Sequence, residues 1–344
     1  MKKATIFLLL ILLIISCKRN KSETDAFTDL TKLYHQKVFD NEELIFRNGE
    51  MLYFNIDSSL IIQSFKSDSL LIKINLKDKK ISHFIPFGSG PNEFVDIYLS
   101  QKISDSTLLF MDNNSSQLIQ LNIITGTIDQ DIAYNNSRCL RMVKLNNHYF
   151  STGIFEEGMF GIWNDSNFMT YMGDYPEDKV DNKNEASKGL AYQGKLLVNE
   201  EFNRLFFCSS LFSYFELFEI SPNITTINSI RKSYLGEYNY APSEDKNIVF
   251  ARPYKSNREG YIDAVATNNR IYLLHSGRSI EDFGINSREK TRLANQILVY
   301  DWDGTLLSKY ETDVDLKNIC INNTENIIYA IAYDPDPEIV FFEL

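Results

Sequence analysis

The 344-residue sequence predicts an all-β fold, a six-bladed β-propeller, with seven blades as the alternative count. Short apolar runs separated by polar turns continue from residue 43 to the C-terminus, which is typical of many short strands. These runs fall into groups of four, and a group together with the loop that follows it occupies roughly 40–60 residues, the length of a propeller blade. Several runs, such as residues 327–333, are apolar or small at every position, so both faces of these strands are expected to be covered.

Residues 1–16 predict a lipoprotein signal peptide. Two lysines precede an apolar run over residues 4–15, and the segment ends in Ile-Ile-Ser-Cys. As a helix this run would span only about 18 Å, which is too short for a bilayer core of about 30 Å. The ending is similar to the bacterial lipobox, so we expect Cys17 to be acylated and to become the mature N-terminus. The alternative is an ordinary secretory signal with a chance cysteine.

Residues 17–42 are expected to connect the lipid anchor to the propeller. The polar stretch 18–24 indicates a flexible tether. Residues 25–39 then predict a short packing helix. Apolar side chains recur there at intervals of three and four, at Phe27, Leu30, Tyr34 and Val38. The propeller domain itself is expected to occupy residues 43–344.

Five complete four-stranded groups are expected, over residues 51–87, 101–133, 142–172, 195–234 and 261–310. Three further strands are expected at the C-terminus, over residues 318–321, 327–333 and 338–343. An N-terminal strand near residues 44–47 would complete this last blade. Closing the ring in this way would hide the last open sheet edges.

Two long interruptions, residues 235–260 and 276–295, are the candidate ligand-binding loops, because loops of this length inside a compact domain are usually functional or mobile. The alternative is that they are a decoration specific to one family. A guanidinium beside such a loop can form a forked contact with a carboxylate or a phosphate. The candidate ligand-binding residues are Arg252, Tyr254, His275, Arg278 and Arg288, with Arg292 as a further arginine. The alternative for the arginines is a role in surface salt bridges.

The motifs of a hydrolase or of a metal site are missing. His275 and Ser276 are adjacent, but neighbouring residues of one strand point to opposite faces and cannot form a nucleophile–base pair. The chain has no Gly-x-Ser-x-Gly motif, and its four histidines show no metal-binding spacing. We therefore expect no catalytic residue, no metal and no cofactor.

The charge and the cysteines also limit the function. The formal net charge of −11 and the lack of a basic stripe disfavour nucleic acid as a partner.

Beyond Cys17 the chain has three widely spaced cysteines, Cys139, Cys208 and Cys320. We expect them to be buried as small apolar residues, without disulfides.

Two stretches carry a family resemblance. Residues 88–94 read Gly-Ser-Gly-Pro-Asn-Glu-Phe, and residues 297–304 read Ile-Leu-Val-Tyr-Asp-Trp-Asp-Gly. Both are similar to segments of a Bacteroidetes-type family of bacterial lipoproteins with a TolB-like six-bladed propeller. The resemblance implies the fold and a location in the cell envelope, and it brings no catalytic residues. By the sorting logic of such bacteria, Lys18 after the cysteine favours the outer membrane, and the basic stretch 18–21 favours its periplasmic face.

The expected function is that of an outer-membrane lipoprotein that binds or scaffolds a partner without catalysis. The partner would be a peptide, a glycan or a protein of the envelope, and it would meet the loop-bearing face. The alternative is an enzyme, a lyase or hydrolase on sugars or peptides, with its site at the central channel. A purely structural component of an envelope complex is the third interpretation.

Overall fold

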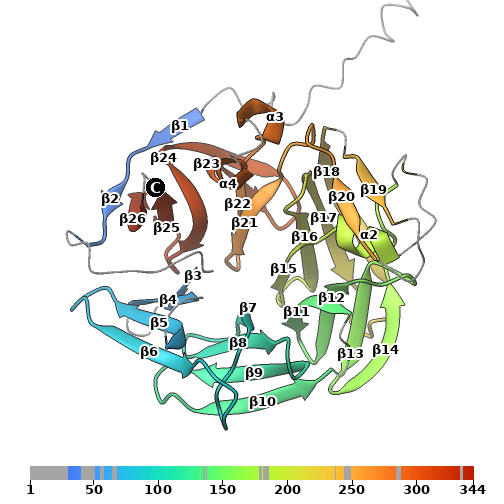
Figure 1. The fold of residues 1–344 in the computed structure, drawn as a ribbon, viewed down its shortest axis with the longest axis horizontal. Coiled ribbons are helices and arrows are strands. Elements are labelled where there is room, and N and C mark those ends of the chain that lie inside the picture. Colours follow the sequence, from blue (N-terminus) through green and yellow to red (C-terminus); the bar gives the residue numbers. More distant parts are fainter. Residues whose placement is uncertain are drawn as a thin grey trace, which may run out of the picture.

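The computed structural model describes residues 30–39, 51–54, 58–63, 68–134, 136, 138–177, 180, 186–236, 238–243, 249–283, 288–333 and 336–344. Six four-stranded antiparallel blades form a ring around a central axis (Figure 1). The predicted all-β fold and the count of six blades are confirmed, and the alternative of seven is wrong. Within the described ranges, no helix is long and apolar enough to cross a membrane.

The first four blades each use four consecutive strands, and the innermost strand comes first. Blade 1 holds β3 (Met51–Phe54), β4 (Ser59–Gln63), β5 (Ser69–Asn75) and β6 (Ile81–Pro86). Blade 2 holds β7 (Ile97–Lys102), β8 (Thr107–Asp112), β9 (Gln117–Asn122) and β10 (Ile128–Ala133). Blade 3 holds β11 (Cys139–Leu145), β12 (His148–Gly153), β13 (Phe160–Asn164) and β14 (Asn167–Met172). Blade 4 holds β15 (Gly194–Asn199), β16 (Arg204–Ser209), β17 (Ser213–Ile220) and β18 (Ile227–Leu235).

The last two blades share one long strand. Blade 5 is made of β21 (Tyr261–Ala266), β22 (Arg270–His275), β23 (Ala294–Asp301) and the first half of β24 (Leu306–Ile321). The second half of β24 is the innermost strand of blade 6 and pairs with β25 (Ile327–Tyr333). Blade 6 continues with β26 (Pro337–Glu343) and ends with β2 (Gln36–Lys37), which pairs with β26. An N-terminal strand therefore closes the ring, as predicted.

The N-terminal segment differs from its prediction in two respects. The helix expected over residues 25–39 is wrong for the described residues 30–39, where the chain forms β1 (Leu30–Leu33) and β2. These strands pair with β24 and β26, whose open edges offer unpaired backbone groups. The closing strand is β2, whereas the strand predicted at residues 44–47 lies outside the described residues.

Six apolar cores hold the blades together, one between each pair of neighbours. Alternate residues of a single strand enter different cores. In β25, Ile328 and Ala330 pack towards blade 5, whereas Ile331 packs towards blade 1. In β4, Ile61 packs towards blade 2 and Leu60 packs towards blade 6. Both faces of these strands are buried, which is the physical reason for their continuous apolar sequences.

Side chains also cap the innermost strands, whose inner edges have no partner strand. The amide of Gln101 on β7 accepts a hydrogen bond from the backbone N–H of Lys144 at 2.7 Å and donates to its carbonyl at 3.0 Å. Gln63 donates to the carbonyl of Ile97 at 2.5 Å. These contacts satisfy backbone groups that would otherwise cost free energy, and they link blade 1 to blade 2 and blade 2 to blade 3.

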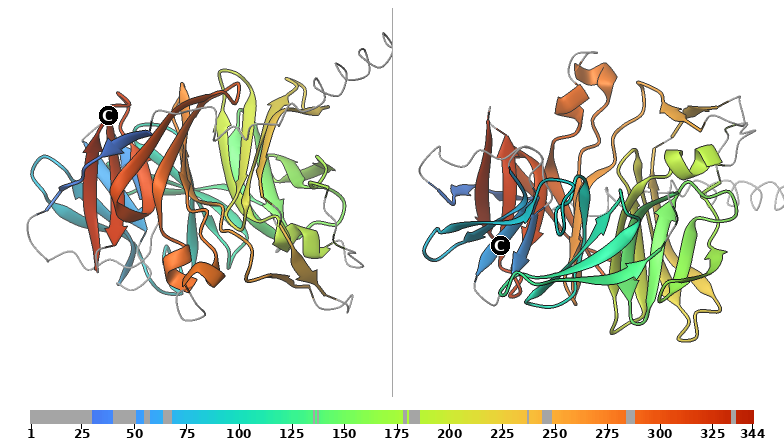
Figure 2. Two further views of the ribbon diagram at one scale, coloured as in Figure 1. Left: turned by 90° about the horizontal axis from the view of Figure 1, so that it is seen from above. Right: turned by 60° about the horizontal axis from the view of Figure 1, so that its bottom comes forward.

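The two long interruptions project from one face of the ring, which we call the insertion face (Figure 2). The first contains a hairpin of β19 (Tyr240–Pro242) and β20 (Ala251–Pro253) before blade 5. The second contains α3 (Ile280–Phe283) and α4 (Arg288–Thr291), between β22 and β23. A further short helix, α2 (Ala186–Ala191), precedes blade 4. The hairpin and helices extend the wall around one end of the ring axis.

Candidate functional site

A cavity of about 310 Å³ lies on the insertion face at the end of the ring axis, and we call it the mouth cavity. The innermost strands of blades 2 to 6 begin at this end of the ring, so side chains from their first residues meet there. The loop before β21 and the turn after α4 complete the wall. The charged side chains in the wall are Arg141, Lys195, Glu259, Asp263, Arg292 and Lys317.

Four of these side chains are cations and two are carboxylates, although the protein is acidic overall. Arg141, near the start of β11, lies with its guanidinium carbon 3.6 Å from the ring centre of Tyr98 on β7. Its Nη1 donates a hydrogen bond to the carbonyl of Leu140 at 2.7 Å. The stacking holds the guanidinium in place through a cation–π attraction. The positive charge of Arg141 is therefore presented to the cavity in a fixed orientation.

Lys195 and Asp263 form a buried ion pair at the base of the mouth cavity. Lys195 Nζ lies 2.5 Å from Asp263 Oδ1, and Asp263 is only 3% exposed. The carboxylate also accepts hydrogen bonds from the backbone N–H groups of Ala264 at 2.8 Å and Ile319 at 2.9 Å. A buried carboxylate needs several such partners to offset the loss of hydration. This pair links blades 4, 5 and 6 and neutralises the charge of Lys195.

Lys317 and Arg292 form the other side of the cavity. Lys317 Nζ donates a hydrogen bond to the carbonyl of Arg292 at 3.3 Å. Burial, and then the nearby charge of Arg292, lower the pKa of Lys317. The Arg292 side chain is exposed at the rim and makes no ion pair with the described part of the chain. An anion placed between these two cations would relieve their mutual repulsion.

A second cavity of about 140 Å³ adjoins the mouth cavity, and we call it the hairpin cavity. Two of the predicted residues, Arg252 and Tyr254, line it together with Leu211, Pro253 and Ile280. The exposed fraction of Tyr254 is 53%. Leu211 and Glu259 belong to the walls of both cavities. The predicted Arg252 and Tyr254 therefore lie beside the mouth cavity.

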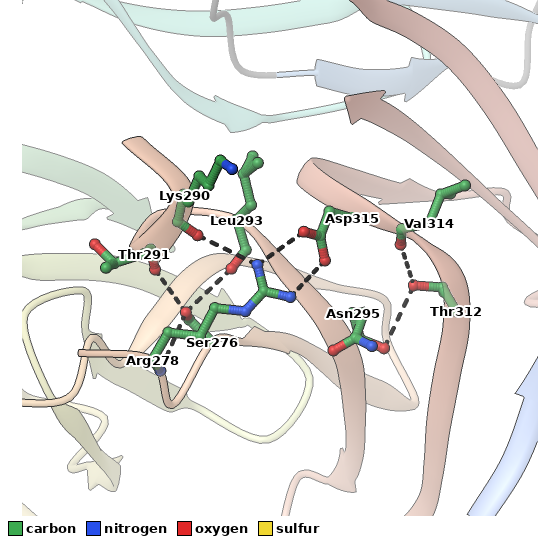
Figure 3. Close-up of polar contacts among 9 residues, drawn as sticks. All are labelled: Ser276, Arg278, Lys290, Thr291, Leu293, Asn295, Thr312, Val314 and Asp315. Atoms are coloured by element: carbon green, nitrogen blue, oxygen red, sulfur yellow. Dashed lines mark hydrogen bonds and ion pairs between the residues drawn. The ribbon is translucent and has the colours of Figure 1, made fainter. Parts of the chain in front are cut away.

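Arg278, also predicted as a ligand contact, forms an ion pair within the fold (Figure 3). Its Nη1 and Nη2 donate to the two oxygens of Asp315 on β24, at 2.8 and 2.5 Å. Nη1 also donates to the carbonyl of Lys290 at 3.2 Å, and Ser276 Oγ donates to the carbonyl of Thr291 at 2.6 Å. These bonds fix the helical insertion to the innermost strand of blade 6. They also occupy the guanidinium fork that a ligand would use.

His275 lies between blades 4 and 5 and does not line either cavity. Its Nε2 is 2.7 Å from Ser213 Oγ, and Tyr261 packs against the ring. Burial lowers the pKa of His275 to about 4, so the imidazole is neutral at physiological pH. Ser213 is buried, so this Ser–His contact is closed to substrate. Arg288 is the first residue of α4, and its side chain lies outside the described structure.

The opposite end of the ring axis has a larger cavity of about 500 Å³, the far cavity. Its charged groups are held in ion pairs: Lys102 Nζ is 2.7 Å from Asp105, and Glu325 is bound at 3.3 Å by Arg270, which lies outside the lining. Lys195 belongs to the walls of both the mouth and the far cavity. Among the described residues, no three His, Cys, Asp or Glu side chains lie close enough to hold a metal ion.

The sequence did not single out Arg141, Lys195 and Lys317. Each is a basic residue at or near the start of an innermost strand, in blades 3, 4 and 6. A basic residue at equivalent positions of several blades is a signal that could have been found. It becomes meaningful only when the ring brings these strand ends together.

Comparisons with known proteins agree with this architecture. The chain is similar to a solved member of the DUF4221 family from Bacteroides vulgatus, with 12% identity, a TM-score of 0.55, and 92% of this chain and 96% of the other covered. It is also similar to a Bacteroides fragilis protein provisionally named as exported, with 10% identity, a TM-score of 0.51 and coverage of 90% and 94%. At these identities the likeness concerns the fold. None of the curated protein sequences matches this chain.

A family model provides the assignment. The model described as TolB-like 6-blade propeller-like matches residues 35–324, which include strands from all six blades and both insertions. This chain therefore belongs to the TolB-like six-bladed propeller family.

Proposed function

We propose that this chain is a lipid-anchored binding protein of the cell envelope, whose mouth cavity takes a ligand that bears a carboxylate. The observation that carries the proposal is the group of cations in that cavity. Lys195 is neutralised by Asp263, but Arg141, Arg292 and Lys317 face the cavity together. Guanidinium groups bind carboxylates through paired, charge-assisted hydrogen bonds.

The proposed location rests on the N-terminal sequence. Residues 1–17 have the pattern of a lipoprotein signal with acylation at Cys17, although they lie outside the described structure. The structurally similar Bacteroides fragilis protein, provisionally named as exported, supports secretion. Lys18 and the basic residues after it favour the outer membrane and its periplasmic face.

The lining of the mouth cavity favours binding over hydrolysis. Among the described residues that line the cavity, Ser210 is the only serine, threonine or cysteine that could act as a nucleophile. The side chain of Ser210 makes no hydrogen bond to a base there, whereas an activated nucleophile needs such a partner. A propeller with this cavity is therefore better suited to hold an anionic group than to cleave a bond.

Calorimetry with citrate tests the proposal. Citrate should bind the mature protein in detergent, and Arg292→Gln should weaken the affinity about tenfold, because the forked partner of one carboxylate is lost. Lys80→Gln removes another exposed cation, from the outside of blade 1, and should change nothing. Absence of citrate binding, or an equal loss in both variants, would contradict the proposal.

A further inference from the structure

The mouth cavity and the hairpin cavity differ in chemistry but share a wall. The mouth cavity presents cations, whereas the lining surface of the hairpin cavity is mostly apolar and includes Leu211, Pro253 and Ile280. Leu211 and Glu259 contribute to both, so the two cavities are adjacent and one extended ligand can reach both. The composite site therefore has a charged half and an apolar half.

The size of the hairpin cavity limits what it can hold. At about 140 Å³ it is smaller than the roughly 300 Å³ at which pockets for whole small molecules begin. Arg252, Tyr254, Lys255, Asn257 and Glu259 also line it, but most of its lining surface is apolar, which suits a single apolar side chain.

Exposed apolar side chains continue this surface along the two insertions. Val249, Phe250 and Tyr254 lie on or beside the hairpin, with exposed fractions between 36% and 53%, and Phe283 of α3 is 41% exposed. Large apolar side chains gathered next to a pocket are typical of a protein or peptide interface. Arg252 and Lys255, between and beside them, are exposed cations.

We propose that the two cavities form one site for the carboxyl-terminal end of a peptide or protein. The terminal carboxylate lies in the mouth cavity, against Arg141 and Arg292. An apolar side chain one or two positions before the end fills the hairpin cavity, against Ile280. The preceding residues leave the ring over Tyr254 and the apolar rim. This inference rests on the proposed function, since it names the class of carboxylate that the mouth cavity receives.

Fluorescence polarisation with defined peptides tests the inference. The probe is a fluorescein-labelled peptide ending in Gly-Ser-Leu-Phe-Ala with a free carboxylate, added to the full mature chain in lipid nanodiscs, with empty nanodiscs as the blank. Its carboxamide and a version with Ser in place of Leu and Phe should each bind about tenfold more weakly. Equal binding of the acid and the carboxamide would overturn the inference. Stronger competition by oligogalacturonate than by any peptide would overturn it as well.

Variants assign each half of the peptide to a cavity. Arg292→Gln should remove most of the preference for the free carboxylate. Ile280→Ser, or Tyr254→Ser on the exposed rim, should remove most of the preference for the apolar residues and leave citrate affinity unchanged. Lys80→Gln is the surface control. Thermal melts of each variant confirm that it is folded.

The outcomes separate the inference from the proposed function. If citrate binds in an Arg292-dependent manner but no peptide shows the two preferences, the peptide inference is wrong and the carboxylate site stands. If neither citrate nor peptide binds, both are wrong. If the peptide preferences survive Ile280→Ser and Tyr254→Ser together, the apolar residues bind elsewhere and the composite site is wrong.

Discussion

The two ends of the ring axis use their charged residues differently. In the far cavity, Lys102 is paired with Asp105 and Glu325 is bound by Arg270, so these charges hold short turns together. At the mouth cavity, Arg292 is exposed without an ion pair in the described structure, and Arg141 is held by an aromatic ring instead of a carboxylate. Paired charges stabilise the ring, whereas Arg141 and Arg292 of the mouth cavity remain available to a ligand.

The insertions account for this difference. Both project from the end that bears the mouth cavity, and each contributes to the wall there (Figure 2). Within the described ranges of the chain, the far end has only turns between strands. The fold therefore places its long insertions, its apolar rim and its available cations on one face.

The largest effect is expected at the ion pair that separates the two cavities. Asp263→Ala leaves Lys195 without its carboxylate and removes the acceptor of two backbone N–H groups, so we expect a loss of about 3–5 kcal/mol in the free energy of unfolding. Urea unfolding measures it. Asp263→Asn keeps an acceptor oxygen and should cost less. A loss below about 1 kcal/mol for Asp263→Ala would show that the pair does not support the ring.

A pH effect of intermediate size is expected on the insertion side. His275 has its pKa lowered to about 4 in the folded protein, whereas an unfolded histidine titrates near 6.5. The unfolded state therefore binds the extra proton between these values, and stability is complete above about pH 6.5 and falls as the pH drops towards 4. The loss should reach about 2–3 kcal/mol. Urea unfolding at pH 7 and pH 4.5 measures it. His275→Gln should flatten this dependence, and an unchanged slope would assign it to other groups.

Matched variants compare the two ends directly. Arg141→Gln in the mouth cavity should weaken citrate binding about tenfold, or about 1.4 kcal/mol. Lys102→Gln in the far cavity should leave it unchanged, because Lys102 is already neutralised by Asp105. Calorimetry measures both. Equal effects would mean that the anion does not distinguish the two ends.

The smallest effect is expected where the helical insertion is attached. A double-mutant cycle between Arg278 and Asp315 should give a coupling energy of about 1 kcal/mol, because the pair is bidentate but partly exposed to water. Urea unfolding of the two single variants and the double variant measures this energy. A coupling near zero would show that other contacts hold the insertion against β24.

The strands and their grouping could be predicted from the sequence because strands buried on both faces have apolar residues at successive positions. Residues such as Ile328 and Ile331 enter different cores, so apolar residues occur at successive positions. The N-terminal error has a physical origin too. Leu30, Tyr34 and Val38 are four residues apart, a spacing that places them on one side of a helix or of a strand. Only the open edges of β24 and β26 decide in favour of strands.

The candidate site was less predictable. Arg252 and Tyr254 could be selected because they lie in a long interruption, and they do line a cavity. Arg278 was selected for the same reason, yet its fork is bound to Asp315, which lies 37 residues further along the chain. The cations of the innermost strands are brought together only by closure of the ring. Local patterns therefore found the loops, but they could not show which charges remain available.

A crystal structure of the protein with citrate tests the central claim most directly. The account predicts a bound citrate in the mouth cavity, with its carboxylates on Arg141 and Arg292 and with Arg278 still paired to Asp315. Citrate bound in the far cavity, or an empty mouth cavity at a concentration that saturates binding in solution, would contradict it.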